Sequence, residues 1–287
     1  MNNAQFCPVG KLEKVLLATD GSAHSEGAIR EAITFAAKCS SKLYACMALE
    51  TNPEYETTTI NVLEKEEADA EAHLASIKAR AEKEGLKCET TLHEGIDAAQ
   101  AIVEDASEKK VHMIVIGRHG RKGLLKALVG ELAEKVVIHA PCKVLVVPKE
   151  AKIEYRSILV ATDGSGHSTA AVQEALNIAK RCGSRIIALS SVRSNDELEK
   201  AQANVNKVLD MAKAEGIEAE AVTPLGRSYN LIVETAGGRG VDLIIMGIPV
   251  KSALEKIFTG SATEKVIGTA GCAVLIVKGE AAVSATV

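Results

Sequence analysis

Two carboxylates at matching places are the first residues of this chain that could do chemistry. Asp20 and Asp163 each follow a short apolar run and stand in an identical pentapeptide, Ala-Thr-Asp-Gly-Ser. An apolar run that ends in such a polar turn is typical of a buried strand that meets the start of a helix. A carboxylate at this place lies at the carboxyl end of a strand, where open α/β sheets bind their ligands.

Two glycine-containing segments are the second chemical feature. The first reads Gly117-Arg118-His119-Gly120, and nine further residues separate it from Gly130-Glu131; the second reads Gly247-Ile248-Pro249-Val250, and nine further residues separate it from Gly260-Ser261. Glycine lets the backbone approach a ligand closely, and the free N–H groups at a helix start attract anions. The two segments therefore predict anion-binding loops, each followed by a helix, at residues 132–139 and 262–269.

The chain contains one fold twice. Asp163 lies 143 residues after Asp20, and the same spacing relates His24 to His167 and Cys39 to Cys182. A period this long indicates a duplicated domain, because solenoid repeats have periods of about 20–50 residues. We expect two domains, residues 1–150 and 151–287, in agreement with the usual size of about 100–200 residues per domain.

Composition narrows the class of partner. The chain has no tryptophan, 2% aromatic residues and a formal net charge of −4. A protein that stacks bases on aromatic rings or attracts phosphate backbones would need more rings or a basic surface, so we expect no nucleic-acid binding. No apolar run approaches the roughly 18 residues that span a bilayer, and the first residues do not resemble a secretory signal. We expect a soluble, cytoplasmic protein without membrane contact.

The seven cysteines are odd in number and have no C-x-x-C spacing. This pattern favours neither a disulfide framework nor a zinc site. Several cysteines lie in apolar strand or helix patterns, where cysteine acts as a small hydrophobe, and Cys39 and Cys182 close the apolar faces of two predicted helices. Cys7, in a polar N-terminal arm, is the exception to this interpretation.

Apolar runs alternate with helical periodicity in both halves. They predict strands at 15–18, 43–49, 86–92, 111–116 and 144–147, and at 158–161, 185–191, 217–222, 243–246 and 274–277. Strands with helices between them require crossover connections, so each half is predicted to be a parallel α/β sheet with helices on both faces. The halves differ by a polar insertion around residues 51–63, predicted as a loop or an extended second helix, and a charged solvent-facing helix follows at 64–84.

These motifs together resemble those of the tandem universal stress proteins. That family is marked by a first strand ending in Asp-Gly-Ser and by the loop G-x-x-G-x9-G-[S/T], and the resemblance covers nearly the whole chain. It extends to Ala133-Glu134-Lys135-Val136 and to Thr263-Glu264-Lys265-Val266 in the helices before the last strands. The resemblance implies two open five-stranded sheets of order 3-2-1-4-5, similar to the adenine-nucleotide α-hydrolases. In one branch of the family it also implies a site for ATP or AMP, which Mg²⁺ could accompany.

The resemblance assigns two sets of binding residues by position. The first set is Ala18, Thr19, Asp20, Ala48, Ile116, Gly117, His119, Gly120, Gly130 and Glu131. The second set is Ala161, Thr162, Asp163, Ser191, Met246, Gly247, Pro249, Val250, Gly260 and Ser261. Both aspartates are expected to accept a hydrogen bond from ribose or base, although they could instead only cap the next helix, as Ser22 and Ser165 could do alone. No catalytic residue and no metal ligand is predicted.

Each half departs once from the family motif. Glu131 places a carboxylate where a hydroxyl residue is expected, and Val250 replaces the second loop glycine beside Pro249, which lacks an N–H group. The sequence therefore leaves open which of the two sites holds a nucleotide.

The sequence is compatible with three functions. The first is a stress-response protein that binds an adenine nucleotide with little or no turnover. The second is an interaction protein without a nucleotide, motivated by Glu131 and Val250. The third is a slow ATPase, which ranks last because the chain lacks the pyrophosphate loop Ser-Gly-Gly-x-Asp-Ser and the His-Ile-Gly-His and Lys-Met-Ser-Lys signatures of the wider superfamily.

The last strand of each half predicts an assembly. Val144–Val147 and Val274–Val277 are unbroken apolar runs at the predicted sheet edges, and an unpaired edge of this kind recruits another strand. In single-domain relatives such pairing makes a homodimer. We therefore expect the two halves to pair within one chain, and two chains could associate again as a homodimer.

Overall fold

The structure is a computed structural model that describes residues 7–10, 12–50, 60–95, 97–118, 130–250 and 262–279. The chain divides into two compact units, and the division between their main parts falls between Glu150 and Ala151. Each unit is described by itself below. The pairing of the two halves through their last strands stays a prediction. No helix in the described ranges is long and apolar enough to cross a membrane.

The first unit contains a parallel five-stranded sheet of order β3-β2-β1-β4-β5. At its centre, Ala18 of β1 pairs with Cys46 of β2 on one side and with Ile116 of β4 on the other. The strands are β1 (Lys14–Thr19), β2 (Lys42–Glu50), β3 (Cys88–Gly95), β4 (Met113–Gly117) and β5 (Lys143–Val147).

The second unit repeats this sheet, in the order β8-β7-β6-β9-β10. Both units therefore have the predicted order 3-2-1-4-5, and the predicted parallel α/β fold is confirmed. The strands are β6 (Ser157–Ala161), β7 (Arg185–Leu189), β8 (Ala219–Val222), β9 (Leu243–Pro249) and β10 (Ala273–Gly279).

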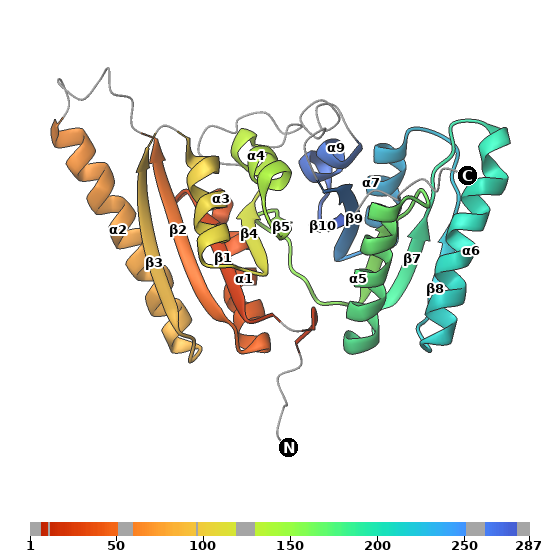
Figure 1. Ribbon diagram of the computed structural model, residues 1–287, viewed down its shortest axis with the longest axis horizontal. Helices are drawn as coiled ribbons and strands as arrows, with labels where there is room; N and C mark the ends of the chain where they lie inside the picture. Colours follow the sequence, from red (N-terminus) through yellow and green to blue (C-terminus); the bar gives the residue numbers. More distant parts are fainter. Residues whose placement is uncertain are drawn as a thin grey trace. The chain divides into compact units, whose positions relative to one another are not determined.

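Helices cover both faces of each sheet (Figure 1). In the first unit, α1 and α2 contact each other, as do α3 and α4, and the second unit repeats this grouping with α5 and α6 and with α7 and α9. Right-handed crossovers explain the grouping, since helices that connect strands in the same direction fall on the same face. The helices are α1 (Glu26–Cys39), α2 (Ile60–Lys83), α3 (Ala98–Glu108), α4 (Glu131–His139), α5 (Gly166–Cys182), α6 (Leu198–Ala214), α7 (Ser228–Gly238) and α9 (Ala262–Thr269), with short 3-10 turns η1 (Ala23–Ser25) and η3 (Asn195–Glu197).

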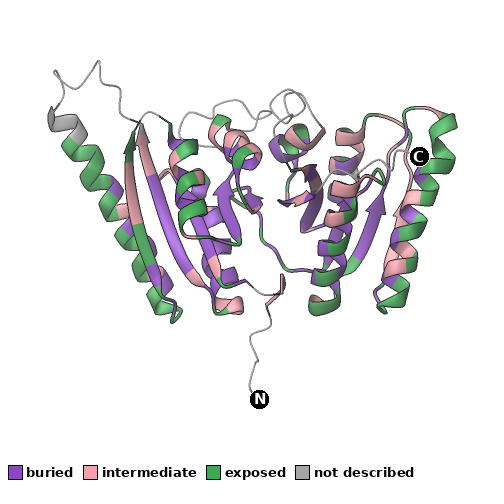
Figure 2. Ribbon diagram, in the orientation of Figure 1, coloured by how far each residue is buried: buried purple, intermediate pink, exposed green. Residues whose placement is uncertain are grey.

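The core of each unit lies between the sheet and its helices. Figure 2 shows buried residues concentrated on the strands, while the helices carry exposed residues on their outer sides. Strands β1 and β4 are buried over almost their whole length, which fits parallel strands that are covered on both faces. Helix α1 contributes Ala28, Ala32 and Phe35 to the core, as its apolar spacing predicts.

Local signals set the helix boundaries. Asp97 caps α3, because its Oδ1 accepts hydrogen bonds from the N–H groups of Ala99 and Gln100 at 2.9 and 3.1 Å. Helix α5 ends at Cys182 and is capped by Gly183, whose φ of 71° is the left-handed conformation that glycine adopts readily. The structure also locates part of the polar insertion predicted around residues 51–63 of the first half. Helix α2 begins at Ile60 and so extends into it, whereas residues 51–59 lie outside the described ranges.

Strand β9 continues beyond the predicted end at Met246 and includes Gly247, Ile248 and Pro249. Gly247 pairs with Val277 and Pro249 with Gly279, and the N–H of Val250 donates to the carbonyl of Gly279 at 3.0 Å. The apolar Ile248 explains the extension, because it is only 3% exposed and its burial favours keeping this segment on the sheet.

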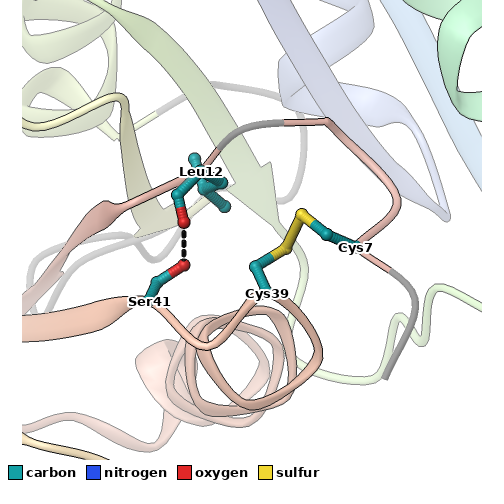
Figure 3. The surroundings of a disulfide bond; sticks show 4 residues. All are labelled: Cys7, Leu12, Cys39 and Ser41. Carbon is teal, nitrogen blue, oxygen red and sulfur yellow. Dashed lines mark hydrogen bonds between the residues drawn. A yellow bond between two sulfur atoms is a disulfide. The ribbon is translucent and has the colours of Figure 1, made fainter. Parts of the chain in front are cut away.

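One disulfide joins Cys7 to Cys39 (Figure 3). The odd cysteine count and the spacing did not predict this bond, and the interpretation of Cys39 as a core hydrophobe is wrong. Cys39 is the last residue of α1, and its sulfur bonds to the arm that leads into β1. A bond between residues 32 positions apart leaves no periodic trace in the sequence.

Candidate functional site

The first candidate site is at the carboxyl end of β1. Ala18 and Thr19 are the last, buried residues of this strand, and Asp20 follows directly. The strands on either side contribute predicted site residues at the same edge, with Ala48 on β2 and Ile116 and Gly117 at the end of β4. Since the chain winds from β1 to β2 in one direction and reaches β4 in the other, this is the switch point at which open α/β sheets bind ligands.

Asp20 uses only one of its two carboxylate oxygens within the protein. Its Oδ1 accepts hydrogen bonds from the backbone N–H of Ser22 at 3.0 Å and from the Ser22 hydroxyl at 2.8 Å. Its Oδ2 is buried and has no hydrogen-bond partner within the described part of the chain. A buried carboxylate oxygen without a donor is costly, and such an atom in a folded protein requires an explanation. Asp20 therefore presents an acceptor that a ligand could satisfy.

Helix capping explains only part of this geometry. The N–H of His24 donates to the Ser22 hydroxyl oxygen at 3.2 Å, so the serine caps the turn η1 that leads into α1. Asp20 in turn holds the serine through its Oδ1. Capping accounts for one oxygen of Asp20 and leaves its Oδ2 unexplained.

A histidine that the sequence analysis did not select also reaches the end of β1. Nε2 of His73, on α2, lies 3.1 Å from the Thr19 hydroxyl, which is also 3.0 Å from the Ser25 hydroxyl and accepts the N–H of Gly21 at 3.2 Å. These contacts fix the turn that carries Asp20. His73 is 54 residues from Thr19, in a charged helix interpreted as solvent-facing, and no local motif indicates its role.

The start of α4 is the second part of the first site. Gly130 is the N-cap residue, its N–H donates to the carbonyl of Arg118 at 3.0 Å, and Glu131 is the first residue of the helix. The Glu131 carboxylate is 83% exposed and lies 3.0 Å from Nζ of Lys135. The first-turn N–H groups of a helix have no partners within the helix, so this terminus can face an anion. His119 and Gly120 lie outside the described residues.

The second unit repeats the aspartate turn but exposes it. Asp163 Oδ1 accepts the N–H of Ser165 at 3.0 Å and its hydroxyl at 2.5 Å, and the hydroxyl groups of Thr162 and Ser168 are 3.2 Å apart. Partial burial raises the pKa of Asp163, but the hydrogen bonds from Ser165 and Ser168 outweigh it, so the pKa lies below its usual value. Asp163 is more exposed than Asp20, and neither of its oxygens is buried without a hydrogen-bond partner as Asp20 Oδ2 is.

The second predicted anion loop begins with Gly247, Ile248 and Pro249, and these three residues belong to strand β9. A Cβ atom on Gly247 would lie 2.0 Å from the backbone oxygen of His167, so this glycine is needed for close packing against α5. The N–H of Val250 already donates to Gly279, and Pro249 has none. The predicted loop is therefore wrong for residues 247–249, which belong to β9 with Ile248 buried, and Val250 follows directly after the strand. Gly260 and Ser261 lie outside the described residues.

The other members of the second set lie at the same edge of their own sheet. Ala161 ends β6, Met246 is buried on β9, and Ser191 follows β7. The Ser191 hydroxyl donates to the Ser228 hydroxyl at 2.6 Å, next to the start of α7. In the described ranges of the chain, no group of histidine, cysteine or acidic residues is placed to hold a metal ion.

Comparisons with known proteins agree on one family. The model of the universal stress protein family matches residues 11–148 and again residues 154–278. The chain is similar to Universal stress protein MJ0531 of Methanocaldococcus jannaschii, with 37% identity over 49% of this chain and 84% of that protein. A solved universal stress protein from Archaeoglobus fulgidus covers 93% of this chain and 96% of its own, with 19% identity and a TM-score of 0.78, and so shares the fold. Another solved universal stress protein, in complex with cAMP, covers 49% of this chain with 25% identity and a TM-score of 0.38.

Proposed function

Because this chain belongs to the universal stress protein family, we propose that it binds an adenine nucleotide, ATP or AMP, as a stress-regulatory ligand with little or no turnover. The first domain carries the proposed site. The single observation behind this choice is the buried Oδ2 of Asp20, which has no hydrogen-bond partner in the described ranges and lies at the switch point of the sheet.

In this proposal, Asp20 recognises the nucleoside. Its Oδ2 accepts a hydrogen bond from a ribose hydroxyl or from the adenine amino group, both of which are donors. Ala48 is partly exposed at the same edge and offers apolar surface for the base, above the buried Ala18 and Ile116, while Thr19 is held in place by Ser25 and His73.

The phosphates are proposed to lie at the start of α4, near Gly117 and Gly130. The helix terminus favours negative charge, and the Glu131 carboxylate does not cancel this because it pairs with Lys135 at 3.0 Å. Mg²⁺ would have to be brought by the nucleotide, since no group of metal-binding side chains is placed for it in the described residues.

The second domain is proposed to bind nucleotide weakly or not at all. Its aspartate is exposed, and the backbone of residues 247–250 is committed to the sheet rather than free to cradle a phosphate. This domain would then serve as a binding surface or structural partner for the first.

Isothermal titration of the full chain with ATP and AMP, with and without Mg²⁺, tests the proposal. We expect one site per chain. Asp20→Asn keeps the oxygen that accepts from Ser22 but replaces the free acceptor by an amide donor, so we expect at least about tenfold weaker binding. Asp163→Asn is the matched control and should leave the affinity within about twofold. Unchanged affinity in Asp20→Asn would overturn the assigned role.

Two further outcomes separate the alternatives. If the wild-type chain gives no binding heat and carries no co-purified nucleotide, an interaction protein without nucleotide is the better description. Phosphate release from ATP, measured over hours, separates a regulatory ligand from a slow ATPase.

A further inference from the structure

The Cys7–Cys39 disulfide ties the N-terminal arm to the end of α1. We refer to residues 7–10 and 12–13 as the arm. The Cα atoms of the two cysteines are 4.3 Å apart, and Figure 3 shows the bond beside the hydrogen bond between Ser41 and Leu12. Cys7 and Cys39 are both partly exposed, so a small thiol or disulfide can reach them.

The arm is also held without the disulfide. The Ser41 hydroxyl donates to the carbonyl of Leu12, and the N–H of Lys42 donates to the carbonyl of Glu13 at 2.8 Å. These two hydrogen bonds dock the chain just before β1.

The second domain repeats this docking and omits the covalent bond. The Ser184 hydroxyl donates to the carbonyl of Tyr155 at 2.6 Å, and the N–H of Arg185 donates to the carbonyl of Arg156 at 3.1 Å. At the repeat spacing of 143 residues, Cys182 matches Cys39, but Glu150 stands where a partner matching Cys7 would be. The second domain therefore shows that this fold forms its first strand without a disulfide, and the bond in the first domain is an addition.

The buried cysteines are poorly suited to thiol exchange. Cys46 and Cys88 are buried, and burial raises the pKa of Cys88 to about 11 and that of Cys272 to about 12. Thiols with such pKa values stay protonated at neutral pH, and the thiolate is the form that exchanges. Cys7 and Cys39 are partly exposed, as are Cys142, Cys182 and Cys272, and they differ from these free cysteines because they are already paired.

We propose that Cys7 and Cys39 form a reversible redox latch on the arm, closed by a low-molecular-weight disulfide of the glutathione type. The Cys7 thiol loses a proton to solvent, and its thiolate attacks one sulfur of the small disulfide, forming a mixed disulfide and releasing one small thiol. The Cys39 thiolate then attacks the Cys7 sulfur and releases the second small thiol. Two protein thiols are oxidised to one protein disulfide, and one small disulfide is reduced to two small thiols.

Opening the latch frees the arm at Cys7 and leaves β1 in place. The hydrogen bonds of Leu12 and Glu13 persist in the reduced protein, so the change is confined to the segment before them. This inference rests on the disulfide and does not depend on nucleotide binding.

Thiol counting on the full chain tests the latch. The protein is equilibrated in buffers of varied reduced-to-oxidised glutathione ratio, quenched with acid, denatured and alkylated, and the alkyl groups are counted by mass spectrometry. We expect seven alkylated cysteines under reducing conditions and five under oxidising conditions, with Cys7 and Cys39 linked in the peptide map. Cys7→Ser should show six under both conditions, and the matched control Cys182→Ser should still lose two.

Hydrogen exchange measures the effect on the arm. In the reduced wild type and in Cys7→Ser, the amides of Val9 and Gly10 should exchange at least about tenfold faster, while those of β1 and of the matching segment at residues 151–157 stay unchanged. Three results would each overturn the proposal. The chain could keep seven thiols under oxidising conditions, the disulfide could stay intact in the most reducing buffer, or hydrogen exchange of the arm could be the same in the oxidised and reduced proteins.

Discussion

Gly247→Ala is expected to disturb the packing of β9 against α5. The added Cβ would lie 2.0 Å from the backbone oxygen of His167, 2.5 Å from its carbonyl carbon and 2.9 Å from the backbone nitrogen of Ser168. All three atoms belong to the backbone of the first turn of α5, so no side-chain rotation can relieve the contact. Either β9 or the start of α5 must move.

The expected cost follows from this geometry. Extra methyl groups in packed cores typically cost about 1–3 kcal/mol, and contact with rigid backbone places this substitution at about 3 kcal/mol. With an m-value of about 2 kcal/mol per molar urea, the unfolding midpoint of the second domain should fall by about 1.5 M. Gly271→Ala is the matched control, because a Cβ there meets nothing within 4 Å and its φ is not in the left-handed region.

Urea unfolding followed by far-ultraviolet circular dichroism measures the shift, and hydrogen exchange of α5 assigns it to the second domain. Nucleotide affinity of the first domain should be unaffected. A Gly247→Ala midpoint equal to that of Gly271→Ala would refute the packing role of this glycine and restore its interpretation as a ligand-binding glycine.

Three further predictions concern stability. Oxidation of the Cys7–Cys39 pair, which closes a loop of 32 residues, should stabilise the first domain by at most about 3–4 kcal/mol, measured as the urea midpoint difference between oxidised protein and Cys7→Ser. Asp97→Ala should cost about 1 kcal/mol by removing the cap of α3. Hydrogen bonds from the α3 backbone lower the pKa of Asp97 in the folded protein. The contribution of Asp97 to the free energy of unfolding should therefore be complete above the pKa that this carboxyl has in the unfolded chain, and it should disappear as the pH falls through the lower pKa of the folded protein. Urea titrations at several pH values would show this loss. Asp242→Ala should cost about 2 kcal/mol, because the N–H groups that donate to this carboxylate just before β6 lose their acceptor, and a thermal shift below about 1 °C would contradict this role.

The fold could be predicted because its signals are local and occur twice. Apolar runs of strand length, the pentapeptides around Asp20 and Asp163 and the helical periodicity between them each depend on residues close in sequence. Their recurrence after 143 residues indicated two copies of one parallel sheet, and the structure confirms its strand order in each unit. The same local reasoning located the end of β1 and the start of α4 to within one residue.

The details of the site depended on contacts between distant residues. Whether Asp20 has an unpartnered oxygen depends on every group that folds around it, and the approach of His73 to Thr19 spans 54 residues. The pattern at 247–250 resembles a loop by its glycine and proline, yet pairing with β10 makes it a strand. The bond between Cys7 and Cys39 likewise requires a close approach that no periodicity encodes. The amino-acid sequence by itself determined the elements and their duplication, whereas only tertiary packing decided which donors and acceptors were consumed inside the protein and which were left for a ligand.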